Sequence, residues 1–261
     1  MNNRLEALRV ERVAVLEFFH DLTPGEWDAP SRCAGWSVKG VLSHMSAIFH
    51  GCFTPWFINL VRTREVEQAN DRDVERRISW TPEQVLREYE VWSARYLRLP
   101  PVLAATGLER LKVPVGELGR YPLGLIPAAL TFDHHLHLRH DVATALGRPV
   151  APIDDKGMAV ALEWMIAGLP QMCRESMTAI DRPVELNLSG PGADSWVLVP
   201  GKGELLEVRP GGSVPAAAAI SGNTEEFALW ATHRTPWREN DVKIDGDTDL
   251  GTRFLDALKI V

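Results

Sequence analysis

Residues 131–142 read TFDHHLHLRHDV and hold four of the chain's eight histidines together with two aspartates. If this segment is an α-helix, each residue turns the chain by about 100°, and most of these side chains share one face. His135 points away from an arc of about 120° that holds the other five: Asp133, His134, His137, His140 and Asp141. Polar stripes on solvent-facing helices usually consist of Glu, Lys and Arg, which favour helices more strongly. The stretch therefore predicts a helix whose imidazoles and carboxylates, one turn apart, bind a divalent metal.

Residues 37–51, SVKGVLSHMSAIFHG, offer a further imidazole for such a site. Ser37 is a typical residue to begin a helix and Gly51 a typical residue to end one. His44 shares its face of this expected helix with the apolar Val41 and Ile48, so it needs a polar partner when it is buried. His50 faces another side, where we expect a surface or capping role.

The expected metal site has two possible ligand sets. His44 and His137 belong to both, and the third ligand is either Asp133 or its neighbour His134; we favour Asp133. Three protein ligands leave one coordination position open, which is the arrangement of catalytic rather than structural metal sites. We expect zinc first, although nickel, iron or manganese also suit nitrogen and oxygen ligands.

Helical patterns fill the rest of the first half of the chain. They predict a helix from the N-terminus to about Asp21, another over about residues 53–67, and one that starts at Thr81-Pro82 and ends at Pro100-Pro101. Between them, the run QANDRDVERR at 68–77 is expected to be a solvated surface. The histidine-rich helix is expected over about 127–146.

Beyond residue 150 the pattern changes to short apolar runs separated by turns. After one more helix at about 154–180, these runs predict strands, followed by a helix near 223–232, a strand at DVKIDG and a closing helix. We therefore expect an α+β protein of two domains, a helical bundle at 1–150 and a smaller α+β domain at 151–261.

Composition limits the classes of partner. The net charge of −7 argues against a nucleic-acid surface, which needs a basic face, and fits the handling of small molecules. Three scattered cysteines without a pairing pattern favour a reducing cytoplasm, and no segment is predicted to span a membrane. We expect a monomer or homodimer. No G-x-S-x-G motif or other convincing nucleophile is present.

Two segments resemble known motifs. The stretch WDAPSRCAGWSVKGVLSHM at 27–45 and the stretch DHHLHLRHDVATALGRP at 133–149 resemble the two metal segments of the mycothiol-dependent maleylpyruvate isomerase family. Members of that family combine a DinB-like metal-binding four-helix bundle with a smaller domain of sterol-carrier-protein type, which LNLSGPGADSWVL at 186–198 echoes. The family more often has Glu at the position of Asp133. In the family the next Asp follows the metal histidine by three residues, whereas here Asp141 follows His137 by four.

The resemblance implies an enzyme that uses the actinobacterial thiol mycothiol as cosubstrate, so that the nucleophile need not come from the protein. It implies transfer of this thiol to a small electrophile, or isomerisation of that electrophile, with His44, Asp133 and His137 as metal ligands. Asp141 or His140 would orient a ligand imidazole or act as general base, and Arg234 would pair with an acidic substrate. Cys33 is expected to be a small buried residue. Two alternatives are a lipid-binding or small-molecule-binding protein without catalysis, and a hydrolase that uses zinc-bound water.

Overall fold

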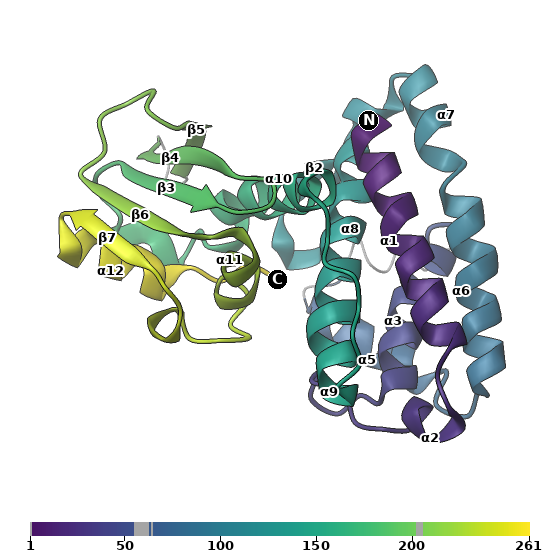
Figure 1. Ribbon diagram of the computed structural model, residues 1–261. Helices are drawn as coiled ribbons and strands as arrows, with labels where there is room; N and C mark the ends of the chain where they lie inside the picture. The colour runs from purple at the N-terminus through teal and green to yellow at the C-terminus, as the bar shows by residue number, and fades with distance from the viewer. Residues whose placement is uncertain (1, 55–62, 64, 202–205) are drawn as a thin grey trace. The chain divides into compact units, whose positions relative to one another are not determined.

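The computed structural model describes residues 2–54, 63, 65–201 and 206–261 (Figure 1). It divides into two compact units, Met1–Ile153 and Asp154–Val261. The first unit is helical and the second contains a five-stranded sheet, which confirms the predicted α+β fold with a helical N-terminal part and a C-terminal sheet domain.

Four long helical segments of the first unit pack side by side, α1 against α8 and α3 against α6. These helices are α1 (Asn2–His20), α3 (Val38–Gly51), α6 (Pro82–Tyr96) and α8 (Ile126–His135). Shorter elements connect them: α2 (Pro24–Trp27), α5 (Val66–Glu75), α7 (Leu99–Ala105), η1 (Leu108–Arg110), β1 (Lys112–Pro114), η2 (Gly116–Leu118), β2 (Arg120–Pro122) and η3 (Leu123–Leu125). Most of the helix expected at 53–67 lies outside the described residues.

Local capping starts two of these helices, α3 and α6, where the sequence predicts. The Ser37 side chain accepts a hydrogen bond from the Gly40 N–H at the start of α3, and Thr81 forms a capping box with Gln84 at the start of α6. One predicted end is wrong, because α6 stops at Tyr96 and the two prolines lie in the first turn of α7. A proline is tolerated there, since the first N–H groups of a helix have no partner within it.

The histidine-rich segment is not a uniform α-helix. Residues Leu136–Ala143 form a π-helix, η4, between α8 and the short α9 (Thr144–Leu146). At its end the Thr144 N–H donates to the Arg139 carbonyl, five residues back instead of four. The turn of about 100° per residue therefore fails over half of the segment, and the predicted positions of the later side chains change. Such π-helical turns are rare in proteins, and those that do occur are frequently found at functional sites.

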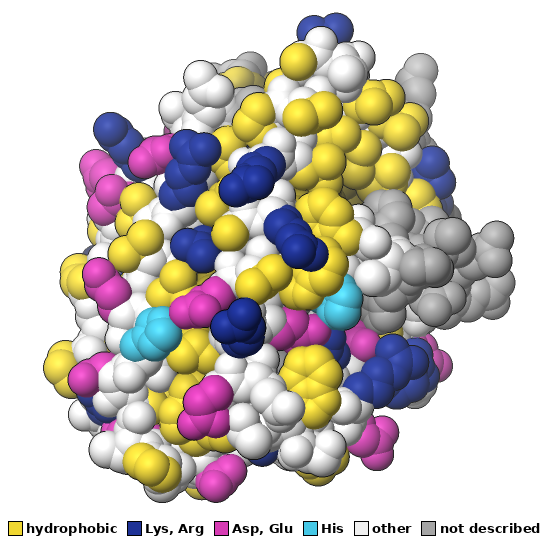
Figure 2. All heavy atoms as spheres, turned by 90° about the vertical axis from the view of Figure 1, so that its right-hand side faces the viewer, with side chains coloured by type: hydrophobic (Ala, Val, Ile, Leu, Met, Phe, Trp, Pro, Cys, Tyr) yellow, Lys and Arg dark blue, Asp and Glu magenta, His cyan; other side chains and the backbone are white. Residues whose placement is uncertain are grey.

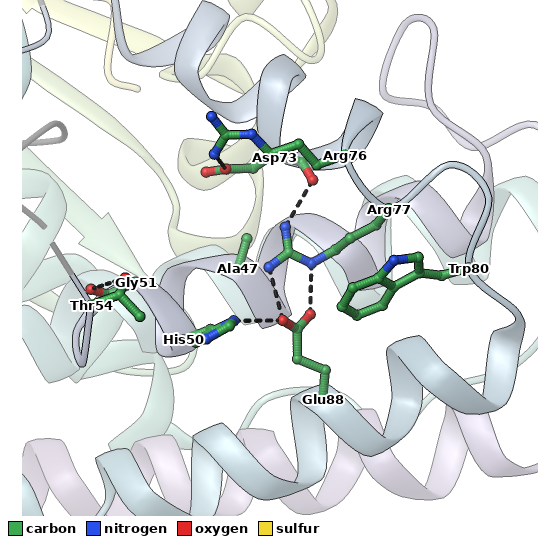
Figure 3. A pocket seen from close by; sticks show the side chains of 9 residues that line it. All are labelled: Ala47, His50, Gly51, Thr54, Asp73, Arg76, Arg77, Trp80 and Glu88. Atoms are coloured by element: carbon green, nitrogen blue, oxygen red, sulfur yellow. Dashed lines mark hydrogen bonds and ion pairs between the residues drawn. The ribbon is translucent and has the colours of Figure 1, made fainter. Parts of the chain in front are cut away.

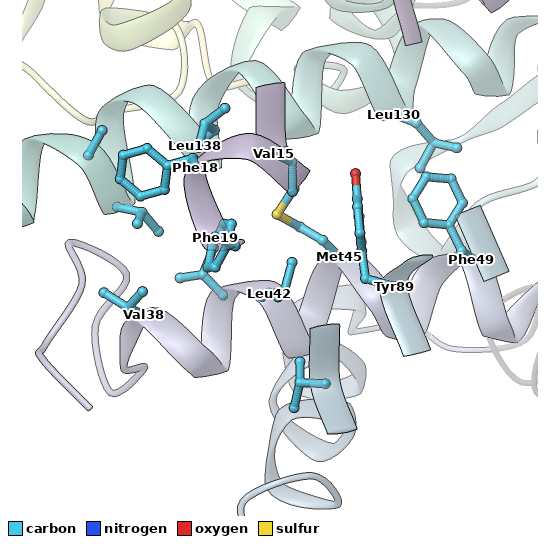
Figure 4. Close-up of a cluster of buried hydrophobic side chains, with 14 of the residues drawn as sticks. Val15, Phe18, Phe19, Val38, Leu42, Met45, Phe49, Tyr89, Leu130 and Leu138 are labelled. Atoms are coloured by element: carbon cyan, nitrogen blue, oxygen red, sulfur yellow. The ribbon is translucent and has the colours of Figure 1, made fainter. Parts of the chain in front are cut away.

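Apolar side chains from all four long helices fill the bundle core (Figure 4). Val15 of α1, Leu42 and Met45 of α3, Tyr89 of α6 and Leu138 of η4 are all fully buried. Each buried side chain of this size contributes about 1.5–3 kcal/mol. This core holds α3 and η4, the two elements that carry the predicted metal histidines, in fixed positions.

The charge-dense run at 68–77 is not simply a solvated surface, and that expectation is wrong for its charged residues Asp73 and Arg77, which are buried. Arg77 is buried and donates two hydrogen bonds to the buried Glu88 of α6, at 2.6 and 2.9 Å. Ser46 and His50 of α3 also bind this carboxylate, at 2.8 and 2.7 Å. Of these residues, His50, Arg77 and Glu88 line a pocket of about 260 Å³ (Figure 3). The network ties together α3, α6 and the end of α5.

The second unit has a mixed sheet with the strand order β5-β4-β3-β6-β7. Strands β3 and β6 are parallel and the other neighbours antiparallel. The strands are β3 (Val184–Ser189), β4 (Asp194–Pro200), β5 (Leu206–Pro210), β6 (Ala218–Asn223) and β7 (Lys243–Gly246). The helical elements are α10 (Asp155–Met172), η5 (Ser176–Ala179), α11 (Thr224–Trp230), η6 (Trp237–Glu239) and α12 (Thr248–Ala257). The residues Val184, Leu186 and Leu188 alternate into the core of this unit.

The surface mixes side chains of all kinds. On the face drawn in Figure 2, basic and acidic side chains are interspersed and apolar ones lie between them. Within the described part of the chain, no helix is both long and apolar enough to cross a bilayer.

Candidate metal centre

Two helical segments far apart in the sequence bring a pair of imidazoles together. His44 lies on α3 and His137 on η4, and their ring centroids are 5.1 Å apart at an interplanar angle of 78°. Both rings direct Nε2 toward the same oxygen, Oδ1 of Asp133, at 3.3 Å from His44 and 3.5 Å from His137. The three side chains predicted as metal ligands therefore converge on one point.

The spacing of these three atoms fits a metal ion. Ligand atoms about 2.0–2.1 Å from a tetrahedral zinc ion lie about 3.3 Å from one another, which is close to the two observed distances. The other carboxylate oxygen, Oδ2 of Asp133, is buried without a hydrogen-bond partner. Such an atom is costly to bury, so the donor set is better satisfied with a cation than without one.

Asp141 orients the His137 ring. Its Oδ2 lies 2.8 Å from Nδ1 of His137, and its side chain is 4% exposed. A carboxylate at this position favours the tautomer with the proton on Nδ1, which leaves the Nε2 lone pair free to bind a metal. The structure thus brings the predicted residue Asp141 to the side of His137 opposite Asp133.

Charge pairing changes the titration of Asp133 and His137. Burial would raise the pKa of Asp133, but the His137 imidazolium and the neighbouring imidazoles of His134 and His44 hold it well below its ordinary value. Burial would likewise lower the pKa of His137, yet the Asp133 charge and the hydrogen bonds to Asp133 and Asp141 raise it well above that of a free histidine. Without a metal, the two groups therefore form an ion pair at neutral pH.

Trp36 forms one wall of the centre. Its ring centroid lies 5.1 Å from that of His44 and 6.3 Å from that of His137, and its Nε1–H donates to Asp71 of α5 at 2.9 Å. Sequence reasoning identified Trp36 through the family motif but not Asp71, which no motif distinguishes from the rest of its charge run. The indole limits the approach of solvent to the two imidazoles on this side.

Cys33 also belongs to this centre, contrary to its expected role as a small buried residue. It is only partly buried, and its Sγ lies 3.6 Å from Nδ1 of His137. The signal for it in the sequence was its place in the loop at 28–37 that carries Trp36, the tryptophan loop, where it lies three residues before that tryptophan.

Two histidines of the predicted arc face elsewhere. His134 is fully buried, and its Nε2 lies 2.9 Å from the Tyr89 hydroxyl in the bundle core. This contact favours Asp133 over His134 as third ligand. The His140 ring packs edge-on against His135 with centroids 5.1 Å apart, five residues along the π-helix. The changed helical register therefore removes His140 from the metal side.

Arg234, the predicted partner of an acidic substrate, belongs to the second unit. It follows α11, is partly buried and donates its backbone N–H to the Leu229 carbonyl at 2.9 Å. Its role in substrate binding stays a prediction.

Known proteins resemble the chain in sequence and in fold. The sequence model of the family described as mycothiol maleylpyruvate isomerase N-terminal domain matches residues 8–143, just over half of the chain. The crystal structure of the mycothiol-dependent maleylpyruvate isomerase has a similar fold, with a TM-score of 0.57 at 13% identity, over 94% of this chain and 92% of that one. A crystal structure of a histidine-to-alanine mutant of that isomerase matches over the same shares at 13% identity, with a TM-score of 0.53. No curated protein sequence matches the chain.

Proposed function

We propose a thiol-dependent enzymatic function for this chain from one premise, that it belongs to the mycothiol maleylpyruvate isomerase N-terminal domain family. The chain is a metal-dependent enzyme that activates mycothiol for isomerisation of a small electrophilic substrate, or for transfer of the thiol to it. The observation that carries this proposal is the convergence of the His44 and His137 Nε2 atoms on Oδ1 of Asp133.

The residues of the centre have separate tasks in this proposal. His44, Asp133 and His137 would hold the metal, and zinc is the first choice for a set of two imidazoles and one carboxylate. When bound there, a metal would supply a positive charge that lowers the pKa of a nearby thiol and favours its thiolate form. Asp141 holds His137 in the binding tautomer, and Trp36 restricts water on one side.

Thiolate chemistry explains how isomerisation can proceed without a nucleophile from the protein. When a thiolate adds to a carbon–carbon double bond conjugated to a carbonyl group, that bond becomes single and can rotate. Expulsion of the same thiolate then restores the double bond in its other geometry, so the thiol is regenerated. Arg234 is proposed to pair with a carboxylate of the substrate, because a guanidinium binds carboxylates through two parallel hydrogen bonds.

The test measures metal content and thiol-dependent turnover in wild type and in the variant His44→Ala. We expect the wild type to retain about one metal ion per chain and to isomerise maleylpyruvate only when mycothiol is added. The variant should lose both the metal and the activity. The matched control is His20→Ala, since His20 is an exposed histidine of α1 that also pairs with a carboxylate, Glu90, at 2.8 Å. Equal metal occupancy in wild type and His44→Ala would refute the proposal.

A further inference from the structure

His137 faces a different set of side chains with each of its two ring nitrogens. On the Nε2 side lie His44 and Asp133, the proposed ligands. On the Nδ1 side lie Oδ2 of Asp141 at 2.8 Å and Sγ of Cys33 at 3.6 Å. Among the described residues, two groups have ligand atoms that all lie within 4.8 Å of one another, and they share His137: His44, Asp133 and His137, and Cys33, His137 and Asp141.

The two groups differ in the chemistry of their donors. The first offers two nitrogens and an oxygen, whereas the second offers a sulfur, a nitrogen and an oxygen. Thiolate ligands select soft cations, and carboxylates and imidazoles alone discriminate less. The group with Cys33 therefore prefers a thiophilic divalent cation such as Cd²⁺.

Backbone contacts hold Cys33 beside His137. The Arg32 N–H donates to the carbonyl of Asp141 at 2.9 Å, which ties the tryptophan loop to η4. The Trp36 N–H donates to the Cys33 carbonyl at 3.0 Å, closing a turn in which Gly35 has a φ of 82°. This conformation suits glycine, which has no Cβ to clash. The thiol is thus part of a fixed loop and, being partly exposed, is open to an ion from solvent.

We propose that Cys33, His137 and Asp141 form a second, thiophilic cation site that competes with the first for the His137 imidazole. A soft cation binds Sγ of Cys33, Nδ1 of His137 and a carboxylate oxygen of Asp141. The thiol proton and the Nδ1 proton of His137 both leave to solvent, and the proton on Nε2 stays on the side of Asp133. Occupation of this site breaks the hydrogen bond from His137 to Asp141, so it weakens metal binding at the first site. The inference rests on the proposed function through the shared His137.

The experiment titrates metal-free protein with Cd²⁺ and follows the ultraviolet charge-transfer absorbance of a cadmium–thiolate bond. The other two cysteines are poor thiolate donors, because burial raises the pKa of Cys52 to about 12 and that of Cys173 to about 11. The variants are Cys33→Ser, which removes the sulfur, His44→Ala, which damages only the first site, and Cys52→Ser as the matched control. Circular dichroism verifies that each variant is folded.

We expect the absorbance in wild type, His44→Ala and Cys52→Ser, and its loss in Cys33→Ser, which should still bind Zn²⁺ as the wild type does. A second measurement uses wild-type protein alone: Cd²⁺ should protect Cys33 from iodoacetamide, as detected by peptide mapping. If the absorbance is absent from the wild type or persists in Cys33→Ser, or if Cd²⁺ does not protect the thiol, the second site does not exist. Failure of the first site has a different signature, namely unchanged Zn²⁺ binding by His44→Ala.

Discussion

Replacing Asp141 by Asn tests whether this carboxylate positions a metal ligand. Its Oδ2 lies 2.8 Å from Nδ1 of His137, and the two side chains are only 4% and 12% exposed, so solvent screens the interaction little. Asparagine keeps the shape and one oxygen acceptor but removes the charge that fixes the His137 tautomer. Loss of such a partner typically weakens metal affinity by about 10–100-fold, which corresponds to roughly 1.4–2.7 kcal/mol.

The affinity is measured by titrating Zn²⁺ against a chromophoric chelator at neutral pH. The control is Glu90→Gln, which removes a carboxylate from an exposed histidine pair, His20–Glu90, with the same separation of 2.8 Å. Exposed pairs contribute little, and this one is not part of the centre, so zinc affinity should not change. If Asp141→Asn binds zinc within about twofold of wild type, a change of roughly 0.4 kcal/mol, the positioning role is refuted.

Three further predictions concern stability. Arg77→Met leaves Glu88 buried without its main counter-charge, so it should lower the free energy of unfolding in urea by roughly 3–5 kcal/mol; a loss below about 1 kcal/mol, the size expected of a surface pair, would contradict this. Ser37→Ala removes the N-cap of α3 and should lower the free energy of unfolding by about 1 kcal/mol in the same assay. An unfolding midpoint equal to that of the wild type would contradict the role of the cap. In metal-free protein, the raised pKa of His137 contributes stability below about pH 6.5, and this stability is lost as the pH rises through the pKa of His137 in the folded state. The lowered pKa of Asp133 contributes stability above about pH 3.9, and this stability is lost as the pH falls through the pKa of Asp133 in the folded state. The difference in unfolding free energy between wild type and Asp133→Asn should therefore be largest between about pH 3.9 and about pH 6.5. A difference independent of pH would disprove the pairing.

Most of the secondary structure follows from local sequence signals. Ser37, Thr81 and Asp154 cap helices through their own side chains, so the residues that begin α3, α6 and α10 can be read directly. Alternating apolar residues such as Leu186 and Leu188 likewise identify strands, because successive side chains point to opposite faces. These effects depend only on neighbours in the chain.

The sequence also predicted which side chains would form the metal centre, although their function as ligands stays a proposal. His44, Asp133 and His137 could be identified because each lies where helical spacing and the family motif place it. Asp71 could not be identified in this way, and Cys33 was marked only by its place in the loop before α3. Their places at the centre depend on a loop and on a helix that reach it only in the folded chain.

Tertiary packing alone decided the hydrogen-bonding register of η4 and the burial of Arg77. An α-helix and a π-helix over 136–143 differ by one residue in each hydrogen bond, and the sequence pattern is compatible with both. Contacts between Arg32 and Asp141 and between His137 and both neighbouring carboxylates accompany the π form. Arg77 is buried because it pairs with Glu88, which lies on another helix, α6. No local sequence pattern identifies this partner, because the two side chains meet only when the helices pack. Short-range hydrogen bonds and periodicity are properties of a segment, whereas the pairing of buried charges is a property of the assembled bundle.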